Sequence, residues 1–104
     1  MSEIEELTQA IREFANKRDW GVFHTPKNLA MAITGEAGEL AAEFQWLTPE
    51  EANTVSGSKL EEIKLEIADV AIYLLRMCDI LEINMSAAIK AKLQINEKRF
   101  PAIK

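Results

Sequence analysis

Apolar residues recur along this chain at intervals of three and four, which is the spacing of one face of an α-helix. In residues 2–18 the apolar stripe consists of Ile4, Leu7, Ile11 and Phe14. A second stripe consists of Leu29, Ile33, Ala37, Leu40 and Phe44. This second helix is expected to begin at Pro26, because Thr25 can cap it and proline suits the first helical position. Residues 19–25 between the two helices are expected to form an aromatic-rich loop.

The second half of the chain predicts further helices. A Thr-Pro pair at 48–49 marks the start of a short helical turn. The Ser-Lys-Leu-Glu sequence at 58–61 is a predicted capping box, and it opens a long helix expected to reach about residue 82. Asn84 can cap a last helix over residues 85–100, which ends before a proline.

The fold class expected from this pattern is all-α. No alternating strand pattern, repeat or low-complexity segment is present, so the helices predict a four-helix bundle in a single domain over residues 1–104. The helix expected over 58–82 is apolar on both sides, with Ile67 and Leu74 on one side and Leu65 and Leu75 on another. Because so short a chain would struggle to cover both sides, a homodimer or homotetramer is expected to complete the bundle.

Composition and charge narrow the classes of function. The chain is 48% hydrophobic and 28% charged, as expected of a globular domain, and it has no apolar run of membrane-spanning length. Its acidic first residues do not resemble a signal peptide, and its one cysteine, Cys78, excludes an intrachain disulfide, so a cytoplasmic location is expected. Cys78 lies in an apolar helical run and is interpreted as a packing residue. The net charge of −5 argues against nucleic acid polymers and leaves a single nucleotide possible as a ligand.

Two pairs of carboxylates carry the candidate chemistry. Glu36 and Glu39 are three residues apart, as are Glu66 and Asp69, so both members of each pair project from one face of a helix. The second pair lies in a nearly continuous apolar run, where uncompensated charges would cost on the order of several kcal/mol. Four acids between two helices therefore predict a hard divalent cation. For the second pair alone, the simpler interpretation is an ion pair with Arg76.

Two further features are weaker signals. Gly35 and Gly38 lie beside the first acids and are costly within a helix. They indicate either another group close to the backbone or tight helix packing, with equal weight. Lys92, Asn96 and Arg99 form one stripe on the last helix that could bind phosphate oxygens. Taken alone, a solvated face explains that stripe better.

Aromatic side chains flank the second helix at its two ends. They are Trp20, Phe23, His24, Phe44 and Trp46. A core cluster is the simpler interpretation, and it suits Phe44 best. Tryptophans in loops near acids and a basic stripe also suit a flat ligand of the size of a nucleobase. Sites for a metal, a phosphate and a ring together describe a nucleotide site.

These residues stand within a longer ordered set of motifs. Glu36-x-x-Glu39 is followed after 26 residues by Glu66-x-x-Asp69. Around them lie Arg18-Asp19-Trp20-x-x-Phe23-His24-x-Pro26-x-Asn28-Leu29, Gly35-Glu36-x-Gly38-Glu39-Leu40, Phe44-Gln45-Trp46, Asp69-Val70-x-Ile72-Tyr73-Leu74 and Lys92-x-x-x-Asn96-x-x-Arg99-Phe100-Pro101. The set resembles the all-α nucleotide pyrophosphohydrolases, in particular the MazG-like branch that contains the dCTP pyrophosphatases. The resemblance covers about residues 5–101, and its one mild departure is Phe100, where tyrosine is common.

The resemblance implies hydrolysis of dCTP or a related deoxynucleoside triphosphate to the monophosphate and pyrophosphate, in nucleotide-pool house-cleaning. It implies that Glu36, Glu39, Glu66 and Asp69 hold Mg²⁺, with Mn²⁺ as a substitute, to screen phosphate charge and to lower the pKa of an attacking water. Glu36 or Glu39 would act as general base. The implied phosphate-binding residues are Lys92, Asn96, Arg99, Tyr73 and Asn28. The implied base-binding residues are Trp20, His24 and Trp46, in part from a second subunit.

Two other functions compete with this one. A di-iron carboxylate bundle requires Glu-x-x-His pairs, and the one histidine, His24, precedes the second helix, so that class is rejected. A non-catalytic helical interaction module would retain the fold, but it would tolerate loss of the acids, all of which are present. The preferred base, the number of metal ions and the choice between dimer and tetramer stay open.

Overall fold

A computed structural model describes residues 1–103, and this part of the chain is helical without a single strand. The elements are α1 (Glu3–Asn16), the short 3₁₀ helix η1 (Trp20–Val22), α2 (Pro26–Ala42), α3 (Pro49–Asn53), α4 (Gly57–Ile80) and α5 (Met85–Arg99). The all-α prediction is confirmed. None of the helices within residues 1–103 combines the length and the apolar character that crossing a membrane requires.

Side chains cap the helices largely where the sequence predicted. The backbone N–H of Asn28 donates to the Thr25 hydroxyl at the start of α2, and that of Ala87 donates to Asn84 at the start of α5. The expected capping box at 58–61 is wrong, because the N-cap of α4 is Ser56, two residues before the predicted cap Ser58. The reason is Gly57, whose φ of +60° suits glycine and brings the chain into the helix before Ser58. A complete capping box instead opens α3.

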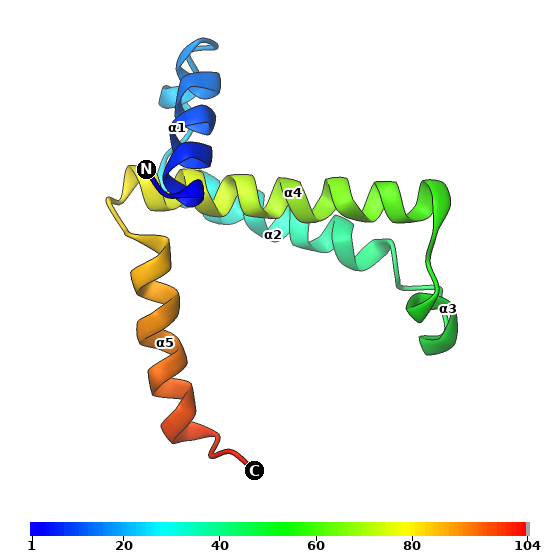
Figure 1. The fold of residues 1–104 in the computed structure, drawn as a ribbon. Helices are drawn as coiled ribbons and strands as arrows, with labels where there is room; N and C mark the ends of the chain where they lie inside the picture. The colour runs from blue at the N-terminus through cyan, green and yellow to red at the C-terminus, as the bar shows by residue number, and fades with distance from the viewer. Residues whose placement is uncertain (104) are drawn as a thin grey trace.

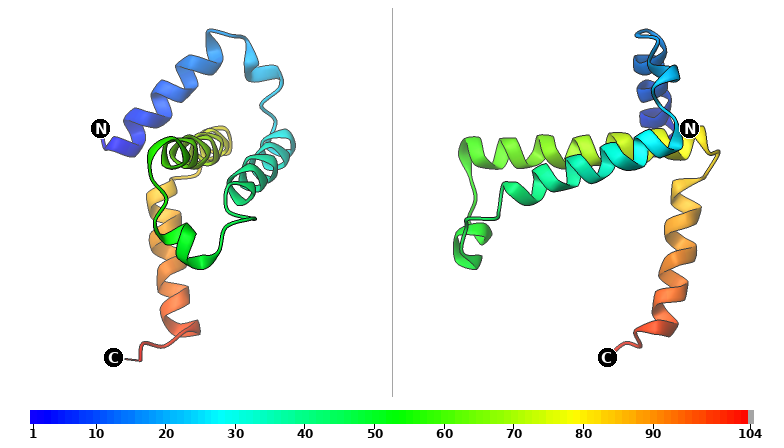
Figure 2. Two further views of the ribbon diagram at one scale, coloured as in Figure 1. Left: turned by 90° about the vertical axis from the view of Figure 1, so that its right-hand side faces the viewer. Right: turned by 180° about the vertical axis from the view of Figure 1, so that it is seen from behind.

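Helices α2 and α4 lie side by side and form the centre of the structure (Figures 1 and 2). Helix α1 crosses the carboxyl-terminal end of α4, and the short α3 caps the opposite end of the α2–α4 pair. Helix α5 leaves the end of α4 and points away from the pair, so it makes no extended contact with another helix in residues 1–103. The bundle within one chain therefore consists of α2 and α4, with α1 laid across the end of α4.

The core of this arrangement is small. Ala15, Leu29 and Ile63 are the buried apolar residues of the described chain. The accessible surface is 8093 Å², whereas a compact monomer of 11.7 kDa would expose about 5,900 Å². The radius of gyration is 16.6 Å, against about 13 Å for a compact domain of this length. Much apolar surface therefore stays uncovered within one chain, including Leu65 and Ile67 of α4.

Candidate active site

Three of the predicted acids converge between α2 and α4. One carboxylate oxygen from each of Glu36, Glu39 and Glu66 lies within 4.8 Å of the others. Glu36 and Glu39 project from one face of α2 because they are three residues apart, and α4, which runs antiparallel beside α2, places Glu66 opposite them. Two helices thus bring three carboxylate oxygens to one point.

The environment of these acids favours a cation. The Oε2 atoms of Glu36 and Glu66 are buried and have no hydrogen-bond partner among the described residues. Desolvation raises the pKa of both carboxyl groups, and repulsion from Glu39 raises it further. Converging carboxylate oxygens that no protein donor satisfies fit a hard divalent cation, which takes oxygen ligands.

Asp69 lies beside this group without joining the tight set of three. It is half-buried, and its charge contributes to the raised pKa values of Glu36 and Glu66. Its role as a fourth ligand stays a prediction.

Glu43 is an acid that the sequence reasoning missed. Its Oε2 is also buried without a partner, and its charge contributes to the raised pKa of Glu66. Its Oε1 lies 3.4 Å from the Nζ of Lys59 on α4. The available signal was spacing, since Glu43 follows Glu39 by four residues and Glu36 by seven, and so shares their face of the helix.

The glycines beside the acids border open space. A Cβ atom added at Gly35 or at Gly38 would meet no other atom within 4 Å in the described chain. Tight packing of another helix of the same chain is therefore not their reason. The open surface leaves room for a ligand or a second copy of the chain to approach the backbone of α2.

A second feature is a pocket of about 340 Å³ beside the acids. Its walls are Trp20, Phe23, His24, Asn28, Leu29, Ala32 and Tyr73. Ala32 precedes Glu36 by four residues on α2, and Tyr73 follows Asp69 by four on α4, so the pocket lies about one helical turn from the acids. We refer to this space as the ring pocket, because aromatic rings form much of its wall.

Local structure fixes the aromatic walls of the ring pocket. Asp19 adopts a left-handed conformation (φ 55°), which aspartate tolerates, and this turns the chain from α1 into η1. Trp20 packs edge-to-face on Phe14 and on His24, and His24 packs edge-to-face on Tyr73. The Asn28 side chain donates to the Phe23 carbonyl and so holds the loop against α2. Four residues predicted as nucleotide ligands thus lie together: Trp20, His24, Asn28 and Tyr73.

Arg76 does not pair with the acids. The sequence suggested an ion pair with Asp69 or Glu66, but the guanidinium contacts Asp79 and His24 instead. Arg76 lies one turn beyond Tyr73, where the α1 end of the molecule brings these partners within reach. No arginine of residues 1–103 therefore forms an ion pair with the acids, which strengthens the case for a metal.

Comparison with known proteins places this geometry in a family. A pyrophosphatase from Archaeoglobus fulgidus has a similar structure, with a TM-score of 0.87 and 43% sequence identity over 98% of this chain and 95% of that one. The chain belongs to the all-α nucleotide pyrophosphohydrolases. It is also 40% identical to dCTP pyrophosphatase 1 from Homo sapiens and 37% identical to the Bos taurus protein, over 95% and 94% of its own length. The chain spans 59% of the length of these relatives, and no family model matches it.

Four of the predicted nucleotide ligands do not line the ring pocket. Trp46 is 85% exposed and is not among the residues that line the pocket. Lys92, Asn96 and Arg99 are on α5, which points away from the α2–α4 pair (Figure 1). The roles of all four residues stay predictions, and those of the three α5 residues require a second copy of the chain.

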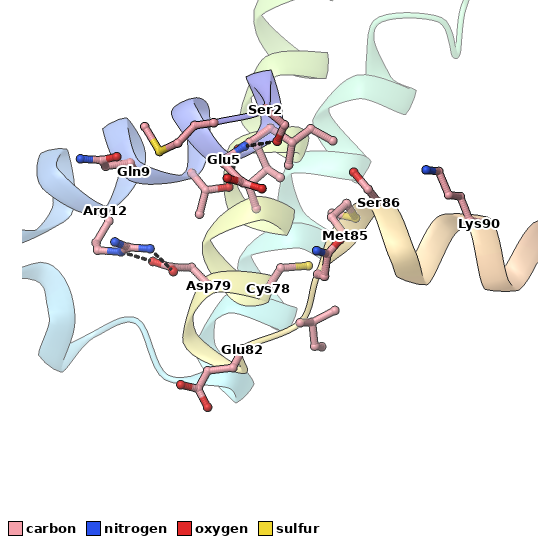
Figure 3. A pocket seen from close by; sticks show the side chains of 16 residues that line it. Ser2, Glu5, Gln9, Arg12, Cys78, Asp79, Glu82, Met85, Ser86 and Lys90 are labelled. Carbon is pink, nitrogen blue, oxygen red and sulfur yellow. Dashed lines mark hydrogen bonds and ion pairs between the residues drawn. The ribbon is translucent and has the colours of Figure 1, made fainter.

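A larger hollow of about 770 Å³ lies between α1, the end of α4 and the start of α5 (Figure 3). None of the predicted site residues line it. Cys78 does, and burial raises the pKa of its thiol, so the group stays protonated. This fits the interpretation of Cys78 as a packing residue rather than a nucleophile.

Proposed function

We propose that this chain hydrolyses deoxynucleoside triphosphates, with dCTP or a related pyrimidine nucleotide preferred, to the monophosphate and pyrophosphate. The observation that carries the proposal is the convergence of Glu36, Glu39 and Glu66 one helical turn from an aromatic pocket. It is supported by the names of the relatives, which are pyrophosphatases and dCTP pyrophosphatases. A role in clearing unwanted nucleotides from the cytoplasm would follow from this activity.

The acids serve as metal ligands in the proposed reaction. Glu36, Glu39, Glu66 and Asp69 would hold Mg²⁺ or Mn²⁺, which supplies charge neutralisation of the phosphates and a more acidic attacking water. Glu36 or Glu39 accepts the proton of that water as general base. The water oxygen forms a bond to the α-phosphorus, the bond from this phosphorus to the α–β bridging oxygen breaks, and pyrophosphate leaves with the electron pair.

The ring pocket and α5 divide the remaining work. Trp20, His24 and Trp46 bind the base, while Asn28 and Tyr73 position the sugar or the phosphates. The α5 stripe of Lys92, Asn96 and Arg99 neutralises the charge that develops on pyrophosphate. Because α5 points away from its own acids, a second copy in a homodimer or homotetramer would supply this stripe. The large uncovered apolar surface of one chain supports such an assembly.

The alternative is a helical module that retains the fold without turnover. Such a module would have no reason to keep buried, unpaired carboxylate oxygens at Glu36 and Glu66, because each raises the free energy of the folded state. The acids therefore favour the enzyme.

The test is hydrolysis of a panel of deoxynucleoside triphosphates in ¹⁸O-labelled water with Mg²⁺. We expect pyrophosphate as product and the label in the monophosphate, because attack is at the α-phosphorus. Glu39→Gln should abolish turnover, whereas Glu62→Gln, on an exposed face of α4, should not. Orthophosphate with a nucleoside diphosphate, or label in pyrophosphate, would contradict the proposal. A chain that turns over none of the panel would be the interaction module.

A further inference from the structure

Arg76 is the one buried charged residue in the described chain. Arg76 is 6% exposed, and a charge that is so deeply buried must be compensated by neighbouring groups. Its Nε donates to Nδ1 of His24 over 3.0 Å, and its Nη1 donates to Oδ2 of Asp79 over 3.3 Å. The side chain therefore joins α4 to the loop that carries His24, 52 residues earlier in the sequence.

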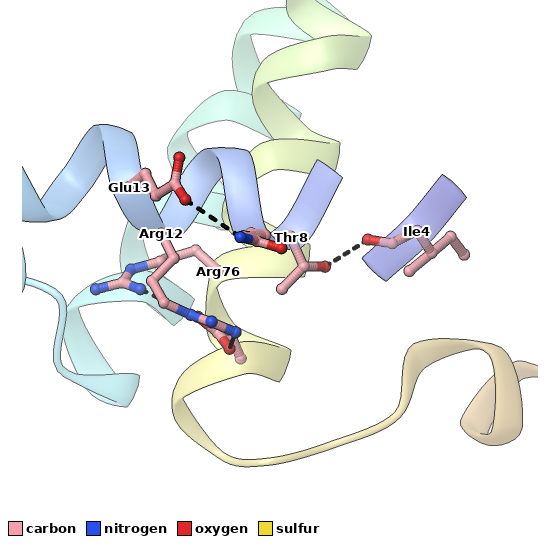
Figure 4. A network of polar contacts seen from close by, with 7 residues as sticks. Ile4, Thr8, Arg12, Glu13 and Arg76 are labelled. Carbon is pink, nitrogen blue, oxygen red and sulfur yellow. Dashed lines mark hydrogen bonds and ion pairs between the residues drawn. The ribbon is translucent and has the colours of Figure 1, made fainter. Parts of the chain in front are cut away.

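Asp79 is itself held in place by α1. Nε of Arg12 donates to Oδ2 of Asp79 over 2.8 Å, and Nη2 donates to Oδ1 over 2.6 Å, which is a bidentate pair. The Arg12 hydrogen bonds hold the pKa of Asp79 below its ordinary value, so the carboxylate is charged at neutral pH. Figure 3 shows the Arg12–Asp79 pair, and Figure 4 shows Arg12 beside Arg76. A continuous polar connection thus runs from Arg12 through Asp79 and Arg76 to His24.

This connection fixes the protonation of the imidazole. A guanidinium group has donors and no acceptor, so the ring nitrogen that it faces carries no hydrogen. In the neutral ring the proton is then on the other nitrogen, Nε2. Turning the ring over would place the Cδ2–H group, which cannot accept a hydrogen bond, opposite Arg76, so the contact itself supports the orientation in which Nδ1 faces the guanidinium. Burial, and then the charge of Arg76, lower the pKa of His24, which agrees with a neutral ring at pH 7.

We propose that Arg76, held by Asp79 and Arg12, is a positioning residue that keeps His24 neutral with its proton on Nε2. His24 then acts in the ring pocket as a hydrogen-bond donor, and it selects a base that presents an acceptor there, such as a pyrimidine ring carbonyl or an unprotonated ring nitrogen. The selection of a base rests on the proposed function, whereas the tautomer does not.

A structural role for Arg76 predicts different results. If Arg76 only tied α1 and α4 together, its replacement would lower Tm and leave the state of His24 and the choice of base unchanged. A positioning role changes the tautomer of His24, and it weakens binding of the base without weakening binding of the phosphates. The discriminating measurements are therefore the tautomer and a comparison of ligands with and without a base.

The tautomer is measured by long-range ¹H–¹⁵N NMR on the full chain without a histidine tag. The chain has one histidine, so one ring gives all the signals. We expect a single neutral form with the proton on Nε2 at pH 7. Arg76→Met should shift the ring to a mixture of tautomers, and Arg76→Lys should restore part of the wild-type pattern. A wild-type ring with its proton on Nδ1, or an Arg76→Met ring identical to wild type, would overturn the inference.

A second variant covers the risk that Arg76→Met does not fold. Arg12 is on the surface, so Arg12→Gln should fold, loosen Asp79 and Arg76, and increase the population of the second tautomer. The connection would be refuted, even without the Arg76 variant, by two results together. The first is that folded Arg12→Gln gives the same ring signals as the wild-type chain, and the second is that the wild-type ring carries its proton on Nδ1.

The consequence for specificity is measured with two ligands. In Arg76→Met, KM for dCTP should rise about ten-fold, as expected for the loss of one good hydrogen bond. Inhibition by tripolyphosphate, which has the phosphates and no base, should be unchanged. Equal weakening of both ligands would overturn the role in base selection. A chain that hydrolyses no nucleotide but shows the expected tautomer would refute the proposed function and leave the positioning of His24 in place.

Discussion

Glu36 of α2 and Glu66 of α4 each keep a buried carboxylate oxygen, Oε2, that no donor of residues 1–103 satisfies. The pKa of each is raised above its ordinary value of 4.5. Between 4.5 and the raised values, the folded chain binds more protons than the unfolded chain. In the absence of a cation, the free energy of unfolding therefore falls as the pH rises through this range. A divalent ion would remove the penalty at neutral pH by pairing with the charged oxygens.

The first prediction concerns stabilisation by Mg²⁺. At one hundred times its Kd, a bound ligand adds about 2.7 kcal/mol, which corresponds to a rise in Tm on the order of 10 °C for a chain of this size. We expect this rise at pH 7 and a much smaller rise at pH 4.5, where protons compete for the same oxygens. Differential scanning calorimetry with and without Mg²⁺ measures both. Glu36→Gln should lose the Mg²⁺ effect, and Glu62→Gln should keep it. Equal shifts at the two pH values would contradict the prediction.

The second prediction concerns Glu43 and Lys59, which lie 3.4 Å apart at the edge of the acidic group. Lys59→Gln removes the positive charge that opposes the negative charge of Glu43. This variant should therefore bind Mg²⁺ a few-fold more tightly. Glu43→Gln should weaken Mg²⁺ binding a few-fold, because it removes a charge near Glu66. Isothermal titration calorimetry measures both. The control is Lys64→Gln, which breaks the exposed pair with Glu61 and should leave Mg²⁺ affinity unchanged.

Local patterns in the sequence predicted the helices and the pairing of acids along each helix. The caps at Thr25 and Asn84 and the shared faces of Glu36 with Glu39 depend on residues three or four apart, so spacing reveals them. The contact of Arg76 with His24 depends on residues 52 apart, and nothing in the local sequence selects His24 over Asp69 as its partner. The direction of α5 was also beyond prediction, because in residues 1–103 it packs along no other helix that would fix its course.

The third prediction concerns the wall of the ring pocket. Stacking of a base on an aromatic side chain contributes about 1–3 kcal/mol, so Trp20→Ala should raise KM by roughly ten-fold while kcat changes less. The matched control is Val22→Ala, in the same short helix but outside the pocket wall. Steady-state kinetics with dCTP measures both variants. An unchanged KM in Trp20→Ala would show that the base binds elsewhere.

The fourth prediction concerns assembly. Leu65 on α4 is 66% exposed within one chain, although it lies in the central helix. We expect the wild-type chain to be a dimer or tetramer by light scattering at micromolar concentration, since a second copy would cover this apolar surface. Leu65→Lys should dissociate or unfold the protein. Ile103→Lys, beyond the last helix, should do neither. A stable and active wild-type monomer would contradict the assembly.

The fifth prediction tests whether one copy supplies α5 to the acids of another. Glu39→Gln and Arg99→Ala should each depress kcat severely, because one removes an acid and the other a cation that stabilises the leaving pyrophosphate. When the two variants are unfolded together and refolded as mixed dimers, each mixed dimer contains one site with both wild-type residues, provided that α5 crosses to its neighbour. Random pairing would then restore about a quarter of the wild-type activity. If α5 instead served the acids of its own chain, every site would carry one of the two substitutions, and the mixture would stay inactive. Trp46→Ala mixed with Glu39→Gln applies the same test to Trp46, which is 85% exposed within one chain.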